Sequence, residues 1–215
     1  MKQRREVAAT VLVSMLGICI SSSFLFSFSL LGNRGFIVSG LTSTLLAISA
    51  LFGAPIAAGS LFLRGAMRSM LGLGLSYVSF FNGLPTLIGA LAIHQPSMVL
   101  FLVVGGAGAF WLHPVGAAAY LYPFLWLIPL LALLGKSMFA RMIIGSFSAH
   151  IVGSLLWLYL GLLHSPAAWT ALIPCVLIER LGVAIVAWAL YMLHRVFWQR
   201  LCGVRNQREP LYRAQ

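Results

Sequence analysis

Residues 137–194 read SMFARMIIGSFSAHIVGSLLWLYLGLLHSPAAWTALIPCVLIERLGVAIVAWALYMLH. Two long apolar runs, Met138–Leu163 and Ala167–Leu193, flank the short turn His164-Ser165-Pro166. A transmembrane helix needs about 20 consecutive apolar residues, and each run exceeds that length. Serine and proline between two such runs are typical of a turn. The stretch therefore predicts a hairpin of two membrane-spanning helices.

Three ionisable side chains lie deep inside this predicted hairpin. His150 lies fifteen residues before Ser165, and Arg180 lies fifteen residues after it, beside Glu179. At a rise of 1.5 Å per residue, both positions are about 22 Å from the turn. They are therefore level with each other, near the middle of a hydrocarbon core about 30 Å thick. A charge at that depth costs about 3 kcal/mol or more, so it normally faces a cavity or a partner.

The charged pair has two interpretations. Glu179 and Arg180 either form part of an intramembrane binding site or satisfy neighbouring helices and fix their packing. Adjacent helical residues are about 100° apart, so both cannot point at His150. We expect Glu179 to face His150, and Arg180 to pair elsewhere or to meet an anionic group of a ligand.

Composition sets the class of protein. Hydrophobic residues make up 61% of the 215 residues, only 8% are charged, and the mean hydropathy is +0.99. A soluble domain of this size needs a far larger charged surface, and the strands of a membrane barrel would alternate rather than run continuously apolar. The chain is thus predicted to be an all-α, polytopic membrane helix bundle in contact with the lipid bilayer.

The apolar runs predict a single membrane domain with six transmembrane spans. A shorter run, 97–112, contains Gly105-Gly106-Ala107-Gly108 and is predicted to be re-entrant or interfacial. The spans are about 7–31, 36–63, 69–93, 115–134, 138–163 and 167–193, followed by a basic tail, 195–215.

The formal charge of +11 supports this topology. With six spans, twelve basic residues lie on one side and only Arg34 on the other, which is the positive-inside pattern. We therefore expect the cytoplasmic (inner) membrane, with both termini cytoplasmic, and no nucleic acid as a partner. The twelve are Lys2, Arg4, Arg5, Arg64, Arg68, Lys136, Arg141, Arg195, Arg200, Arg205, Arg208 and Arg213.

Small and helix-breaking residues mark the second and third spans. Ala50, Ala54 and Ala58 lie on one face of the second span, where they favour close helix packing or docking of a partner membrane protein. Pro55 should kink that helix or end its regular part. In the third span, Asn82-Gly83-Leu84-Pro85 predicts a broken helix, which is tolerated only beside protein or a water-filled cavity.

One face of the fifth span carries a hydroxyl, an imidazole, a bare backbone and an indole, from Ser146, His150, Gly153 and Trp157. Such a face can line a site for a small planar polar molecule or pack closely against another helix. The small residues Gly145 and Ala149 beside it favour close packing. The candidate substrate-binding residues are His150, Glu179, Arg180, Ser146, Trp157 and Asn82.

Several kinds of chemistry lack the residues they need. The chain contains no aspartate, its five histidines are isolated from one another, and its three cysteines are scattered. We therefore expect no metal site, no cofactor and no disulfide framework. His150 and Glu179 alone are weak evidence for an enzyme, so we do not expect catalysis.

The chain resembles the substrate-binding (S) subunits of energy-coupling factor (ECF) vitamin transporters. The resemblance lies in the six spans, the inside termini and the ladder Ala50-x-x-x-Ala54-x-x-x-Ala58. The stretches Gly145–Gly153 and Ile178–Leu181 also resemble this class. The resemblance implies transport. The chain would capture a vitamin or precursor and work with a membrane coupling protein and ATPases. The resemblance assigns no binding residue.

Two other functions fit the sequence. One is a membrane assembly or scaffold protein whose buried charges are structural. The other is an intramembrane enzyme that uses His150 and Glu179.

Overall fold

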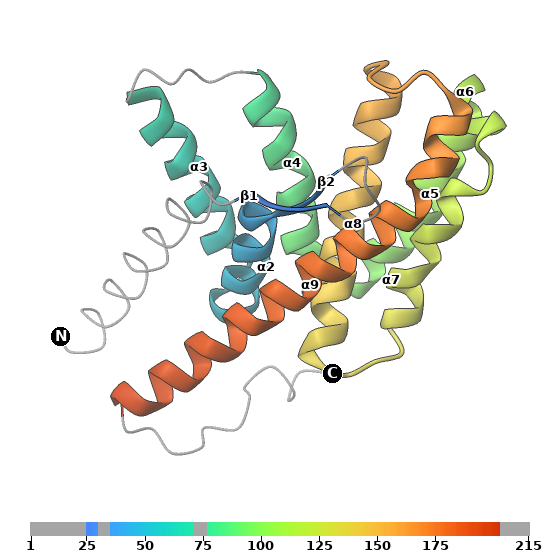
Figure 1. The fold of residues 1–215 in the computed structure, drawn as a ribbon. Coiled ribbons are helices and arrows are strands. Elements are labelled where there is room, and N and C mark those ends of the chain that lie inside the picture. The colour runs from blue at the N-terminus through green and yellow to red at the C-terminus, as the bar shows by residue number, and fades with distance from the viewer. Residues whose placement is uncertain (1–24, 30–34, 71–76, 203–215) are drawn as a thin grey trace.

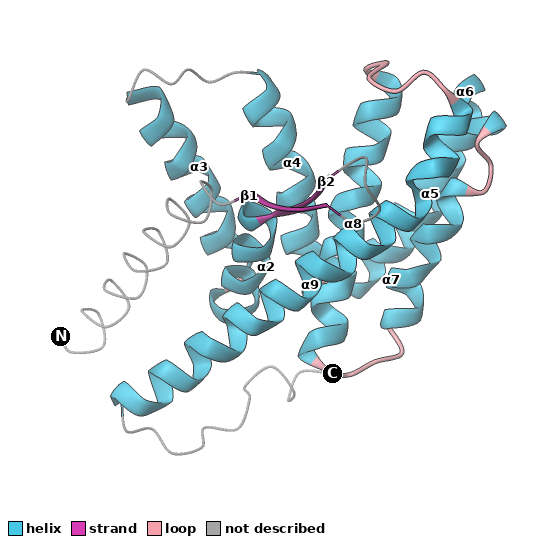
Figure 2. Cartoon of the chain, in the orientation of Figure 1, coloured by secondary structure: helices cyan, strands magenta, loops and turns pink. Residues whose placement is uncertain are grey.

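The computed structural model describes residues 25–29, 35–70 and 77–202, whose regular structure is helical apart from one short hairpin of strands (Figures 1 and 2). The strands are β1, Leu25–Ser29, and β2, Gly35–Ser39, paired antiparallel with Leu25 opposite Ser39. The helices are α2, Gly40–Phe52; α3, Ala54–Met70; α4, Tyr77–Ala92; α5, Pro96–Leu112; α6, Pro114–Ala118; the 3₁₀-helix η1, Tyr122–Trp126; α7, Leu127–Ala132; α8, Met138–Tyr159; and α9, Pro166–Cys202.

The predicted helical class is confirmed for the described residues. Two helices are long and apolar enough to cross a membrane, Met138–Tyr159 and Pro166–Phe197, and the other apolar helices are shorter. These two are the arms of the predicted hairpin.

The strand hairpin corrects the predicted bounds of the first two spans. Helix was predicted over 7–31 and from residue 36, but 25–29 and 35–39 are strands. The segment Leu25–Ser29 alternates large apolar side chains with serine, and β2 contains Ile37 and Val38. Alternation and β-branched residues both favour strands. Residues 7–24 lie outside the described part of the chain.

Helix α8 is the centre of the bundle. It contacts α2, α4, α5, α7, η1 and α9, and most of its side chains between Met142 and Ser154 are buried. Helix α9 crosses the bundle diagonally and contacts both α8 and α2 (Figure 1). With 37 residues, α9 is about 55 Å long.

The closest helix crossing joins α4 to α8 at two glycines. A Cβ atom on Gly89 would press against the carbonyl oxygen of Gly145 and lie 2.9 Å from the Ala149 Cβ. A Cβ atom on Gly145 would lie 3.0 Å from the carbonyl oxygen of Gly89. Farther along α8, a Cβ atom on Gly153 would be 3.8 Å from the Pro85 ring. The small residues of α8 thus serve helix packing, which is one of the two interpretations of this face.

The second predicted span is divided at Gly53. This residue has φ +91°, a conformation that glycine adopts readily, and α3 begins at the next residue. Pro55 therefore lies in the first turn of α3, where a missing N–H is tolerated. On the other side of the break, Ala50 is buried in a cluster with Ala184 and Ala187 of α9. The alanine ladder is thus at least partly internal.

Two other predicted features differ from the structure. Helix α4 continues through 82–85 and contains Pro85, where a broken helix was expected. The predicted span 115–134 is instead divided among α6, η1 and α7. Pro123 and Pro129 remove backbone donors from that segment, which weakens a continuous helix.

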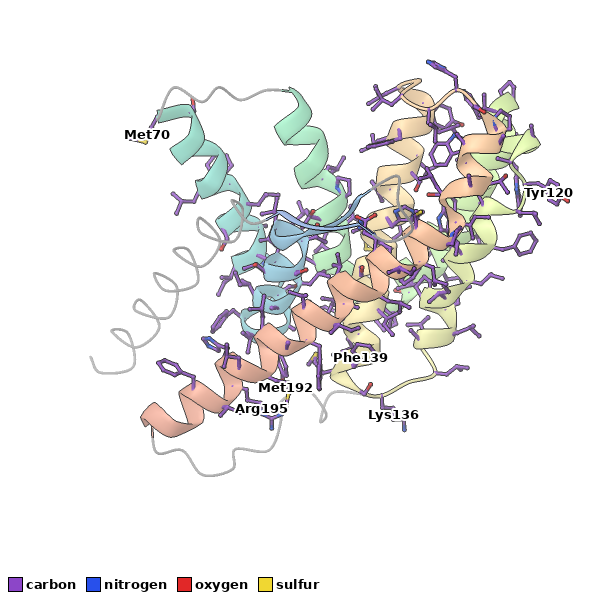
Figure 3. All side chains as sticks on the ribbon, viewed as in Figure 1. Met70, Tyr120, Lys136, Phe139, Met192 and Arg195 are labelled. Carbon is purple, nitrogen blue, oxygen red and sulfur yellow. The ribbon has the colours of Figure 1, made fainter. Side chains whose placement is uncertain are left out.

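The ends of the helices define two ends of the bundle. The C-terminal end of α3, with Met70, lies at the same end as the turn between α8 and α9, whereas Lys136 and Arg195 lie toward the opposite end (Figures 1 and 3). The sequence-based topology had put Arg64 and Arg68 of α3 on the same side as Lys136. Helix α5 covers the predicted re-entrant segment 97–112 and is one continuous helix leading to the upper end, where α6 lies (Figure 1). Because α5 does not turn back as a re-entrant segment would, the end of α3 and Lys136 lie at opposite ends of the bundle rather than at the same end.

The α4–α8 crossing predicts the effect of a single methyl group. Gly89→Ala should destabilise the protein by about 1–3 kcal/mol, because the new Cβ meets backbone and the helices must separate. Gly105→Ala is the matched control, since a Cβ atom on Gly105 of α5 meets nothing within 4 Å. Thermal unfolding in detergent measures both variants. Equal unfolding temperatures for the two variants would refute the close crossing.

Candidate functional site

A triangle of hydrogen-bonding groups lies between α8 and η1. The hydroxyl of Tyr122 is 2.7 Å from Nε2 of His150 and 3.2 Å from Oγ of Ser154, and Ser154 Oγ is 3.1 Å from the same His150 nitrogen. His150 and Ser154 are one helical turn apart on α8, so both reach the tyrosine from the same direction. Tyr122 is 1% exposed and Ser154 is buried, whereas His150 is half-buried.

The triangle uses only one nitrogen of the imidazole. Two hydroxyls meet at Nε2, and a tyrosine O–H donates to a neutral imidazole nitrogen at this distance. In that arrangement the imidazole proton resides on Nδ1. Within the described residues Nδ1 of His150 has no hydrogen-bond partner. This second nitrogen is thus available to bind another molecule.

Aromatic rings surround the tyrosine. Tyr122 stacks on Phe110 of α5, with ring centroids 5.4 Å apart and an interplanar angle of 18°. It meets the edge of Trp169 of α9 at 4.8 Å and that of Trp126 at 6.2 Å. The indole N–H of Trp169 donates to the carbonyl oxygen of Leu163 at 3.1 Å, which fixes that ring. The polar triangle therefore lies in apolar surroundings, where hydrogen bonds and charges act more strongly than in water.

Helix α9 brings the two opposite charges close to this triangle. Arg180 Nη2 and Glu179 Oε1 form an ion pair, with side chains 11% and 26% exposed respectively. Both charges act electrostatically on the Tyr122 hydroxyl, and that of Arg180 also acts on His150. Ser146 of α8 donates to the backbone carbonyl of Arg180 at 2.8 Å and so joins the two helices. This bond places the charged pair of α9 beside the helix that carries His150 and Ser154.

The prediction that Glu179 faces His150 is corrected by these contacts. The hydrogen-bond partners of His150 are Tyr122 and Ser154, and the ion-pair partner of Glu179 is its neighbour Arg180. Although adjacent helical positions diverge by about 100°, both side chains are long enough to meet beyond the backbone. An unpaired charge at this depth is more costly than such a bend in the side chains.

The other candidate residues are dispersed. Ser146 is buried and oriented to the α9 backbone, and Trp157 is 51% exposed. Asn82 belongs to α4, and its side chain is not among those described. The proposed face of Ser146, His150, Gly153 and Trp157 is therefore not a single site, since its members meet different neighbours.

Two residues of the triangle, Tyr122 and Ser154, were not among the candidates predicted from the sequence. Ser154 follows His150 by four residues, a spacing that puts both on one helix face, so a signal existed. Tyr122 gave no such signal, because its position depends on the interruption of the segment 115–134 by α6 and η1.

Among the described residues, no three His, Cys, Asp or Glu side chains gather as they would to hold a metal ion. No protein-family model, curated protein or solved structure matches the chain.

The polar triangle predicts a difference between two tyrosines. Tyr122→Phe removes a buried hydroxyl with two partners and should destabilise the protein by about 0.6–1.5 kcal/mol. Tyr120→Phe is the control. Because Tyr120 is 58% exposed, this variant should unfold at the parental temperature. Thermal unfolding of the purified variants in detergent measures the difference. An unchanged unfolding temperature for Tyr122→Phe would contradict the role assigned to the triangle.

Proposed function

We propose that this chain is an integral protein of the cytoplasmic membrane, with a polytopic helix bundle that binds a small molecule. The two long apolar helices support a membrane location. Large apolar side chains also point outward, among them Phe62, Phe101 and Leu112, which are 81%, 81% and 84% exposed. Exposed apolar surface of this kind is typical of a protein covered by lipid or by a partner.

The orientation in the membrane follows from the basic residues. Lys136 lies between α7 and α8, and Arg195 lies on the distal part of α9, toward the same end of the bundle (Figure 3). Cytoplasmic loops are enriched in Lys and Arg, so we assign this end to the cytoplasm. The end of α3 and the α8–α9 turn then face the other side of the membrane. For the N-terminus, we propose a cytoplasmic location from the charge pattern of the sequence.

Reporter fusions test this orientation. Fusions after Lys136 and after Arg205 should report the cytoplasm, because of the basic residues that lie there. A fusion after Met70 should report the opposite side, as the arrangement of α3 requires. The charge pattern taken alone, which puts Arg64 and Arg68 inside, expects the cytoplasm at Met70. A cytoplasmic result at that position would therefore overturn the orientation drawn from the structure.

The proposed activity is the capture of a small molecule for uptake. The observation that carries it is the ion pair of Glu179 and Arg180 beside the Tyr122–His150–Ser154 triangle, enclosed by aromatic rings. Sites for small ligands typically have apolar walls and a small number of precisely placed polar groups. The resemblance to S subunits of energy-coupling factor transporters supplies the proposed role, with a coupling protein and ATPases as partners.

The partner would need a surface other than the alanine ladder. In this ladder Ala50 and Ala54 are buried within the bundle and Ala58 is half-buried, so most of its surface is closed to a partner. On α3, Phe62 and Met70 are exposed instead. We therefore assign coupling to an apolar outer surface such as that of α3.

A structural role for the charged pair is the second candidate. It is favoured by the pairing of Glu179 with Arg180, which satisfies each charge within one helix. The enzyme alternative has less support, because His150 bonds to Tyr122 and Ser154 rather than to Glu179.

A double substitution separates binding from packing. Glu179→Gln with Arg180→Gln removes both charges together, so the variant should fold, since neutralising a complete pair costs little. Wild-type protein purified in mild detergent should release a bound small molecule detected by mass spectrometry, and the double variant should release none. Trp157→Phe, at a half-exposed position apart from the pair, should retain the molecule. A double variant that folds and carries the same molecule would assign the pair a structural role.

A further inference from the structure

Buried polar atoms without partners indicate what the site lacks. Five such side-chain atoms occur among the described residues, and three of them are hydroxyls, which can both donate and accept. The other two are Nε of Arg180 and Nε1 of Trp126, and both can only donate. Trp126 contacts the Tyr122 ring, and the backbone of Arg180 accepts a hydrogen bond from Ser146, one helical turn before His150. The missing partner is therefore a hydrogen-bond acceptor.

The guanidinium of Arg180 favours one kind of acceptor. Its Nη2 is engaged by Glu179, whereas Nε, on the same edge of the guanidinium, has no partner. A guanidinium binds a carboxylate most strongly through two parallel N–H donors, one of which is commonly Nε–H. An unpaired donor on a buried charged group carries a large desolvation penalty. A carboxylate at this edge would offset that penalty.

We propose that the small molecule bound at this site carries a carboxylate, which accepts hydrogen bonds from the Nε edge of Arg180. This inference rests on the proposed function and names the chemical class of its ligand. The rings of Phe110, Tyr122 and Trp169 provide apolar surroundings for a planar remainder of the molecule. The indole N–H of Trp126 donates to a further acceptor on it, and Nδ1 of His150 provides another polar contact.

The two members of the ion pair then affect binding in opposite directions. Arg180 attracts the carboxylate, whereas Glu179 repels it and competes for the same guanidinium. Removing the acidic side chain should strengthen binding, and removing the basic one should abolish it. If the ion pair were purely structural, the two substitutions would not change binding in opposite directions.

Benzoate and its uncharged analogue benzamide are suitable probes, since they differ only in the group in question. Thermal unfolding of the full chain in detergent is followed against the concentration of each probe. Benzoate should raise the unfolding temperature of the wild type, and benzamide should have no effect. Glu179→Gln should bind benzoate about ten-fold more tightly or better, as expected for a charged hydrogen bond released from competition. The double variant Glu179→Gln with Arg180→Gln should lose the response, and Trp157→Phe should keep it.

Four results would overturn the proposal. They are equal stabilisation by benzoate and benzamide, no response to benzoate, weaker benzoate binding by Glu179→Gln, and a response that persists in the double variant. If the molecule released from the wild type is neutral or cationic, and the double variant lacks it, small-molecule binding stands and the carboxylate is excluded. If the wild type releases nothing and responds to neither probe, both proposals fail.

Discussion

The bundle depends on the contact between the backbones of α4 and α8 at Gly89 and Gly145. Neither glycine has room for a side chain, because each would collide with the carbonyl oxygen of the other. Membrane helices gain little from excluding lipid, so dispersion between closely packed backbones is a main source of their association. This crossing fixes one face of α8 and leaves its other faces to α5, α9 and η1. The polar residues His150 and Ser154 lie on another face of the same helix, so the contact with α4 also sets their position.

Among the described residues, most buried hydroxyl groups are bonded to a partner, whereas those of Thr44, Ser60 and Ser148 are not. The hydroxyls of Tyr122 and Ser154 share His150, and Ser146 bonds to the α9 backbone. Away from this region, Ser49 bonds to a carbonyl of α4, at Ala90, and so joins α2 to α4. In apolar surroundings each satisfied bond adds only about 1 kcal/mol, whereas an unsatisfied group costs about 1–3 kcal/mol. The polar contacts therefore specify which helix faces meet, and the small and apolar residues supply most of the stability.

The sequence predicted the parts of this fold that depend on composition and counting. The helical hairpin 137–194 and the proximity of His150 to the charged pair both follow from helix rise and apolar length. The partner of each charge did not follow, because side chains of several freely rotating bonds reach neighbours that the backbone direction does not indicate. The break at Gly53 was expected two residues later, at Pro55, since one sequence cannot distinguish a proline in a first turn from one in a helix interior. Tyr122 could not be placed either, because its position depends on packing that no local pattern encodes.

Packing alone gives little reason for the charges of α9. Among the described residues, neither Glu179 nor Arg180 forms a side-chain bond to another helix, since the two pair with each other. The contact to α8 uses the Arg180 carbonyl, which any residue at that position would provide. Apolar residues of similar volume would therefore keep the helix contacts and avoid the cost of burying two charges. A buried pair that joins no helices, beside an unsatisfied guanidinium nitrogen and an imidazole with an open nitrogen, is better explained by a bound molecule than by the stability of the bundle.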